Sequence, residues 1–136
     1  MEKNVLILLV EDDVVDVKTV QRAFKENKMK NPLAIVGNGE EALEYLRSAN
    51  NPRPGLILLD LNMPVMNGIE FLKVAKADDG LRSIPVIVLT TSQDESDRVY
   101  SYNLSVAGYI TKPVEFEKFV EAVKIIDLYW NLCEMA

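Results

Sequence analysis

Four uninterrupted aliphatic residues, 56–59, lead directly into Asp60, and this run constrains the fold more than any other part of the sequence. A strand buried on both faces has such a continuous apolar pattern, whereas a strand with one solvated face alternates. Pro64 follows soon after and cannot donate to a sheet ladder, so we expect the strand to end near Asp60. Ligands of open α/β sheets bind outside the carboxyl ends of the strands. Asp60 therefore lies either at a functional site or at an ordinary solvated strand end.

The rest of the chain repeats this pattern of strand and helix. Further apolar strands are predicted at residues 5–10, 33–36, 86–89 and 107–110, and helices at 14–28, 40–49, 69–78, 92–104 and from 114 towards the C-terminus. Ser92 and Glu95 have the spacing of a capping box at the fourth helix. Asp13 either joins a functional group or only starts the first helix, where a negative charge suits the helix dipole.

Alternating strands and helices with short connections indicate right-handed βαβ units. The fold class is therefore α/β, with a five-stranded parallel sheet that carries helices on both faces. A chain of 136 residues has the length of one ordinary domain, and no linker or change of composition divides it. We expect residues 1–136 to form a single domain with an extended C-terminal helix and no output domain.

The composition excludes several classes of function. The chain has no histidine, which removes serine–histidine and cysteine–histidine nucleophiles and the usual zinc sites. Its net charge is −6 without a cluster of lysine or arginine, so we expect no nucleic-acid binding. It lacks an apolar run that could span a membrane and a recognisable signal peptide, and Cys133 is its one cysteine. These features predict a cytoplasmic protein that does not bind membranes.

Polar side chains follow four of the predicted strands. Glu11 and Asp12 follow the first, Asp60 the third, Thr90 the fourth and Lys112 the fifth, so a parallel sheet would bring them to one edge. Three neighbouring carboxylates repel one another, and a hard cation such as Mg²⁺ would offset that repulsion. Lysine and threonine are groups that stabilise a transferred phosphoryl group, and an aspartate can act as its acceptor. The pattern predicts phosphoryl transfer onto Asp60.

In their order and combination, these residues resemble the receiver domain of two-component response regulators. The resemblance covers about residues 4–127, and the matching segments are 9–13, 60–64 with Gly68, 88–91 and 108–113. It implies a flavodoxin-like (βα)5 fold with sheet order 2-1-3-4-5. It also implies a phosphoprotein that accepts its phosphoryl group from a histidine kinase and changes conformation to signal to a partner.

The resemblance implies a role for each matching residue. Asp60 would be the phosphoacceptor, Thr90 would hydrogen-bond the phosphoryl group, Lys112 would pair with it, and Tyr109 would turn inward as Thr90 moves. Such a protein catalyses only its own phosphorylation and dephosphorylation, and it is not an enzyme with other substrates.

The same resemblance implies a Mg²⁺ site. Asp12 and Asp60 would bind the ion by their side chains, Asn62 would bind it by its backbone carbonyl, and Glu11 would act mostly through water.

The last predicted helix is apolar nearly all round, which a helix packed on one side should not be. One stripe suits the core, and a second set of apolar residues lies mostly on the other side: Ile125, Leu128, Tyr129 and Leu132. We expect this second set to form a homodimer or to dock a partner, with folding back onto the domain as the alternative. With this tail and residues 102–104, the chain resembles the small receivers that partner bacterial phytochromes.

Three other functions compete with this interpretation. A degenerate receiver used only for docking is one, but the intact acidic set and Lys112 argue against it. A phosphatase of the haloacid dehalogenase type has Asp-x-Asp after its first strand, whereas here Asn62 stands two residues after Asp60. A flavin-binding module is disfavoured because Glu11 and Asp12 would repel the cofactor's phosphate.

Overall fold

The computed structural model describes residues 5–91, 93–112, 114–115 and 117–124. A single parallel sheet with the order β2-β1-β3-β4-β5 forms the centre of this part of the chain. The strands are β1 Ile7–Val10, β2 Leu33–Val36, β3 Leu56–Asp60, β4 Val86–Thr90 and β5 Gly108–Thr111. The predicted sheet order and strand direction are confirmed, and each strand lies within two residues of its predicted position.

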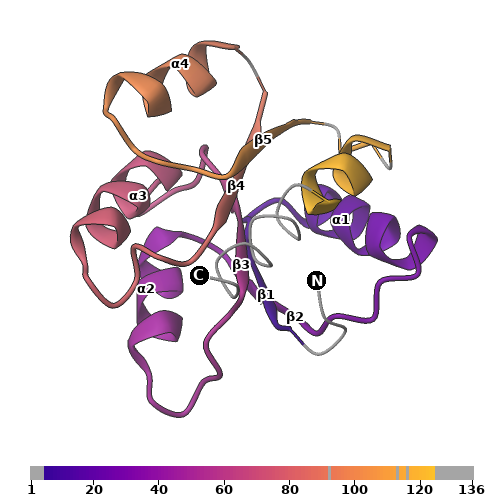
Figure 1. Cartoon of the computed structure of the whole chain (residues 1–136), viewed down its shortest axis with the longest axis horizontal. Helices are drawn as coiled ribbons and strands as arrows, with labels where there is room; N and C mark the ends of the chain where they lie inside the picture. Colours follow the sequence, from indigo (N-terminus) through magenta and orange to yellow (C-terminus); the bar gives the residue numbers. More distant parts are fainter. Residues whose placement is uncertain (1–4, 92, 113, 116, 125–136) are drawn as a thin grey trace.

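Helices cover both faces of the sheet (Figure 1). The helices are α1 Val14–Glu26, α2 Gly39–Arg47, α3 Gly68–Ala77 and α4 Gln93–Ser101, and residues 117–124 are also helical. Helices α2 and α3 lie on one side of the sheet, whereas α1 and the yellow segment 117–124 lie on the other (Figure 1). This arrangement confirms the predicted flavodoxin-like α/β fold.

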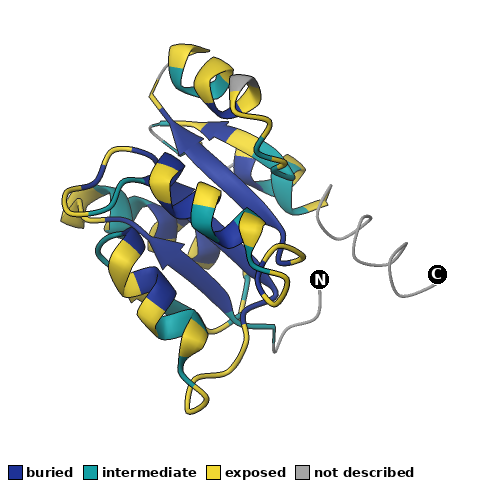
Figure 2. Ribbon diagram, turned by 90° about the vertical axis from the view of Figure 1, so that its left-hand side faces the viewer, coloured by how far each residue is buried: buried dark blue, intermediate teal, exposed yellow. Residues whose placement is uncertain are grey.

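The sheet separates two apolar clusters. Leu8 and Val10 of β1 belong to the cluster beneath α2 and α3, and Ile7 and Leu9 belong to the cluster beneath α1. Successive strand residues point to opposite faces, so a strand between two helical layers must be apolar at every position. The dark blue strands between partly yellow helices in Figure 2 show the result. This is the physical reason for the unbroken aliphatic runs in the sequence.

The helix ends are set by local hydrogen bonds. The Asp13 carboxylate accepts hydrogen bonds from the backbone of Val15 and Asp16, which confirms that this residue starts α1. A capping box that the sequence analysis did not anticipate joins Asn67 and Glu70 at the start of α3.

Helix α4 ends at Ser101, three residues before the predicted end. Asn103 has a φ of 56°, a left-handed conformation that terminates helices. Ser92, the first member of the capping box predicted for this helix, lies outside the described residues.

No helix in the described part of the chain is long and apolar enough to cross a lipid bilayer. The four predicted contact residues of the C-terminal helix, Ile125, Leu128, Tyr129 and Leu132, lie outside that part.

Candidate functional site

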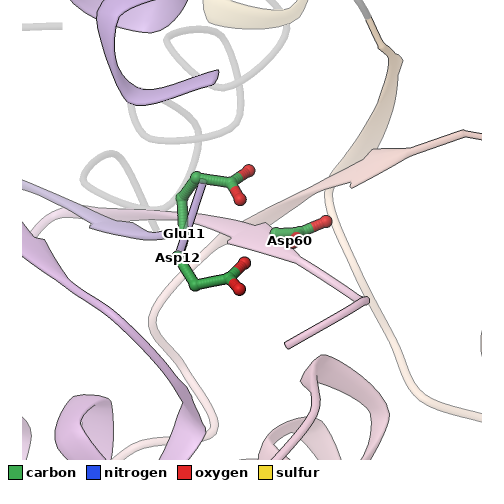
Figure 3. A group of neighbouring side chains, drawn as sticks. All are labelled: Glu11, Asp12 and Asp60. Carbon is green, nitrogen blue, oxygen red and sulfur yellow. The ribbon is translucent and has the colours of Figure 1, made fainter. Parts of the chain in front are cut away.

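Three carboxylates meet at the carboxyl edge of the sheet. Glu11 and Asp12 follow β1, and Asp60 is the last residue of β3, whose Leu59 is in register with Val10. The side chains of Glu11, Asp12 and Asp60 extend to the same side of the two strand ends (Figure 3), and each offers an oxygen within 4.8 Å of the others. Glu11 and Asp60 are each only 2% exposed, whereas Asp12 is exposed. The predicted acidic group is therefore formed, with two of its members buried.

Lys112 reaches this group from the end of β5. Its Nζ lies 2.8 Å from Glu11 Oε2 and 3.0 Å from Asp60 Oδ1, and its side chain is only 11% exposed. Its backbone N–H donates to the carbonyl of Thr90 at 2.7 Å, which fixes the chain just beyond β5 to the end of β4. The backbone of Lys112 is therefore fixed beside the end of β4, and from there its side chain reaches the buried carboxylates.

Burial and charge perturb the pKa of the groups in this site. Burial raises the pKa of Glu11 to about 7, helped by the charge of Asp60 and opposed by contacts with Lys112 and the backbone N–H of Asp13. Burial alone would lower the pKa of Lys112, but its contacts with Asp16, Glu11 and Asp60 outweigh burial and raise it. Lys112 is thus cationic at any ordinary pH, whereas Glu11 changes between its neutral and its charged form near neutral pH.

The site has more negative charge than the lysine can offset. Glu11 Oε2 and Asp60 Oδ1 are buried, and neither takes part in a correctly oriented hydrogen bond with another described residue. Both oxygens lie at ion-pair distance from Lys112, so they have charge compensation without a directed donor. Buried oxygens of this kind, next to a third carboxylate, fit a divalent cation with oxygen ligands.

Thr90 and Tyr109 lie at neighbouring positions of the same edge. Thr90 ends β4 and is 3% exposed, one residue beyond Leu89, which is in register with Asp60. Tyr109 on β5 is 43% exposed and lines a surface pocket with Thr90 and Thr111. The structure therefore places Thr90 at the site and leaves Tyr109 partly exposed beside it.

The Asn62 side chain contacts helix α4. Its side-chain amide donates to the carboxylate of Glu95 on α4, and that carboxylate also accepts from Thr91 N at 3.0 Å and Thr91 Oγ1 at 2.9 Å. Glu95 thus connects the loops that follow β3 and β4. From the sequence, only a role in a helix cap could be predicted for Glu95, because its contact with Asn62 joins elements that are distant in the sequence.

Asp16 is a second residue that the sequence analysis missed. Its Oδ2 accepts a hydrogen bond from Lys112 Nζ at 2.8 Å. The available signal was its position in the first turn of α1, because helical side chains point back towards the N-terminus and hence towards the end of β1. An acidic residue there is usually explained by the helix dipole, so that signal did not identify a partner.

A family model and a related protein assign this chain to the same family. The family model described as the response regulator receiver domain matches residues 7–124. The response regulator Rcp1 of Synechocystis sp. strain PCC 6803 is 40% identical over 129 residues, which cover 92% of this chain and 88% of Rcp1.

Solved structures agree with this match. The bacteriophytochrome response regulator RtBRR superposes with a TM-score of 0.84 at 43% identity, covering 90% of this chain and 78% of RtBRR. The Mn²⁺-bound form of Rcp1 superposes with a TM-score of 0.74 at 40% identity, covering 92% of this chain and 93% of that structure. The matches decide against the phosphatase and flavin-binding alternatives. The chain belongs to the response regulator receiver family, the phosphoryl-accepting signalling proteins of two-component systems.

Proposed function

We propose that Asp60 is the residue that accepts the phosphoryl group, and that the donor is a phosphohistidine of a histidine kinase. One observation carries this assignment: the buried Oδ1 of Asp60 is 3.0 Å from the Lys112 ammonium and is not engaged in a directed hydrogen bond with a described residue. A carboxylate oxygen in that state is free to attack phosphorus. The adjacent ammonium stands where a phosphoryl oxygen would need a counter-charge.

The transfer exchanges one bond to phosphorus for another. An Asp60 oxygen attacks the phosphorus, a P–O bond forms as the P–N bond to the kinase histidine breaks, and the leaving imidazole recovers its lone pair and takes up a proton. Lys112 offsets charge on the transferred group, and the Thr90 hydroxyl, at the end of the adjacent strand, donates to it. The chain catalyses only its own phosphorylation and dephosphorylation.

Mg²⁺ is the cation that we assign to the carboxylate group. Asp12 and Asp60 would hold it by their side chains, Asn62 would hold it by its backbone carbonyl, and Glu11 would act mostly through water. When bound, the ion would offset the charge of the carboxylates and of the phosphoryl group. The two buried carboxylate oxygens without a directed donor support this assignment.

Phosphorylation would then shift a conformational equilibrium. A phosphoryl group adds negative charge and strong acceptor oxygens beside Thr90, so the state in which Thr90 moves towards it becomes favoured. Tyr109 would turn inward into the space that Thr90 leaves. The exposed ring of Tyr109 and the pocket that it shares with Thr90 support this role.

Incubation with Mg²⁺ and a small phosphoryl donor tests the acceptor. We expect intact-mass spectrometry to detect the gain of one phosphoryl group from acetyl phosphate or phosphoramidate. Asp60→Asn should abolish that gain because the neutral amide oxygen is a far weaker nucleophile than a carboxylate oxygen. Asp79→Asn is the matched control, since the Asp79 side chain is 88% exposed and pairs with Arg82. No gain with either donor or with a phosphorylated histidine kinase would favour the docking-module alternative.

We assign a kinase of the phytochrome class as the donor and the cytoplasm as the location. The names of the related response regulators RtBRR and RcpA, at 43% and 41% identity, include bacteriophytochrome and cyanobacterial phytochrome. Phosphoryl transfer from a purified phytochrome kinase, compared with transfer from an unrelated histidine kinase, tests the assignment. Equal rates from both kinases would contradict it.

We also propose that the chain forms a homodimer through Ile125, Leu128, Tyr129 and Leu132. The support is the apolar pattern of the sequence, which leaves these side chains beyond the stripe that suits the core. Light scattering should give a dimer mass, and Leu128→Glu should reduce it to that of a monomer. Lys124→Glu, which adds the same side chain at an exposed position, is the control. A monomer mass for the phosphorylated wild type would count against the dimer.

A further inference from the structure

Asp16 is a partner of Lys112 that does not belong to the carboxylate cluster. Its Oδ2 lies 2.8 Å from Lys112 Nζ, and the bond joins the first turn of α1 to the residue after β5, 96 positions later. The Asp16 side chain is 27% exposed and the Lys112 side chain 11%, so the pair is largely removed from solvent. An ion pair in this environment is screened much less than one on the open surface.

The three carboxylate contacts of Lys112 are not equivalent. Glu11 Oε2 and Asp60 Oδ1 are at ion-pair distance, but neither has a correctly oriented hydrogen bond with a described residue. The contact with Asp16 meets both the distance and the direction of a hydrogen bond. Among the three carboxylates in contact with Lys112, Asp16 is therefore the one that accepts a correctly oriented hydrogen bond from the ammonium.

The three partners also differ in what else they would bind. Glu11, Asp12 and Asp60 form the group that fits a divalent cation, and Asp16 is not part of it. A cation bound at that group would interact with the carboxylates of Glu11 and Asp60 and would weaken their attraction to the Lys112 ammonium. Asp16 would still pair with Lys112, because it is not among the carboxylates that would bind the cation.

We propose that Asp16 is a positioning residue that holds the Lys112 ammonium beside Asp60 before the phosphoryl group arrives. This role rests on the proposed functions of Asp60 and Lys112. A lysine side chain has a long flexible stem, and ordering it costs conformational entropy. The charge-assisted bond to Asp16 orders the ammonium in the resting state. The entropy cost of ordering Lys112 is therefore not added to the barrier for phosphoryl transfer.

A double-mutant cycle on the phosphorylation rate separates this role from a structural one. Asp16→Asn and Lys112→Met are made singly and together, and initial rates with phosphoramidate and Mg²⁺ are followed by intact mass over a range of donor concentrations. Asp16→Asn should lower the maximal rate about tenfold with little change in the donor concentration for half-maximal rate. In the Lys112→Met background, Asp16→Asn should have no further effect, because no ammonium remains to be positioned.

Asp13→Asn is the matched control for charge and helix stability. Asp13 is an exposed acidic residue at the same end of α1, and asparagine caps a helix as well as aspartate does. We expect a change in rate of less than about twofold for this variant, against about tenfold for Asp16→Asn.

The following results would contradict the positioning role of Asp16. An unchanged rate in Asp16→Asn, or an equal fall with and without Lys112, would overturn the positioning role while leaving Asp60 as acceptor. A wild type that gains no phosphoryl group would overturn both proposals. If Lys112→Met is too slow to measure, the Lys112 ¹⁵Nζ–H NMR signal decides: Asp16→Asn should broaden it, and an unchanged signal would overturn the role.

Discussion

At the scale of single residues, Glu11 is a carboxylate whose charge conflicts with its buried environment. It is 2% exposed, it lies near two other carboxylates, and its Oε2 forms an ion pair with Lys112. Burial is the main cause of its raised pKa of about 7, against 4.5 for an ordinary glutamate. The folded, metal-free protein therefore retains a proton over a pH range in which the unfolded chain has lost it.

This difference predicts how stability changes with pH when EDTA removes divalent cations. A group whose pKa is raised by folding contributes stability below its unfolded pKa, near 4.5, and loses that contribution as the pH rises through about 7. The Tm of the metal-free protein should therefore fall by several degrees from pH 5 to pH 8.

Glu11→Gln supplies the comparison, because glutamine does not titrate, and its Tm should depend much less on pH in this range. Mg²⁺ should also reduce the dependence, because the cation favours the ionised carboxylate. Equal pH dependence in wild type and Glu11→Gln would show that another group is responsible.

The sequence predicts which residues gather at the site better than it predicts their contacts. Glu11, Asp12, Asp60 and Lys112 follow strands, and a parallel sheet brings strand ends to one edge whatever the side-chain details. The bond from Lys112 to Asp16 depends on the rotamers of two side chains 96 positions apart. No periodicity in the sequence encodes such a contact.

At the scale of elements, the strands were predictable because burial on both faces demands an unbroken apolar run. Helix ends were less predictable because they depend on single residues. The left-handed conformation of Asn103 ends α4 early, and the capping box at Asn67 starts α3 at Gly68, one residue before the predicted start. Both features are local geometries that compete with several others of similar energy.

The junction of β3 and α3 gives a prediction at this scale. A Cβ on Gly68 would lie 2.5 Å from the carbonyl oxygen of Asp60 and 2.8 Å from Leu61 Cα, and neither backbone atom can move without displacing the strand end. Gly68→Ala should cost roughly 1–3 kcal/mol of stability, measured by urea unfolding, and should slow phosphorylation of Asp60.

Gly108→Ala is the matched control within β5, because a Cβ there would meet nothing within 4 Å. Alanine is also better suited than glycine to a strand, so this variant should be as stable as wild type or slightly more stable. Similar losses for Gly68→Ala and Gly108→Ala would contradict the argument from close approach.

At the scale of the whole molecule, the sheet divides the core into two clusters that share none of their buried residues. Phe71 of α3 is fully buried in one cluster. Phe119, in the helical segment 117–124, is fully buried in the other and contacts Phe24 of α1, with ring centroids 5.1 Å apart and planes tilted by 37°. The contact between Phe24 and Phe119 thus packs segment 117–124 directly against α1.

This division predicts which mutations interact. Phe24→Leu, Phe71→Leu and Phe119→Leu should each cost on the order of 1–2 kcal/mol, small enough to keep the domain folded. In urea unfolding, Phe24→Leu with Phe119→Leu should deviate from additivity by about 0.5–1.5 kcal/mol, because either single change already removes the aromatic contact. Phe71→Leu with Phe119→Leu should be additive to within about 0.5 kcal/mol. The contradicting result would be a deviation from additivity for Phe71→Leu with Phe119→Leu as large as that for Phe24→Leu with Phe119→Leu. It would mean that the two apolar clusters are energetically coupled across the sheet, so that a movement of segment 117–124 also changes the packing of α3.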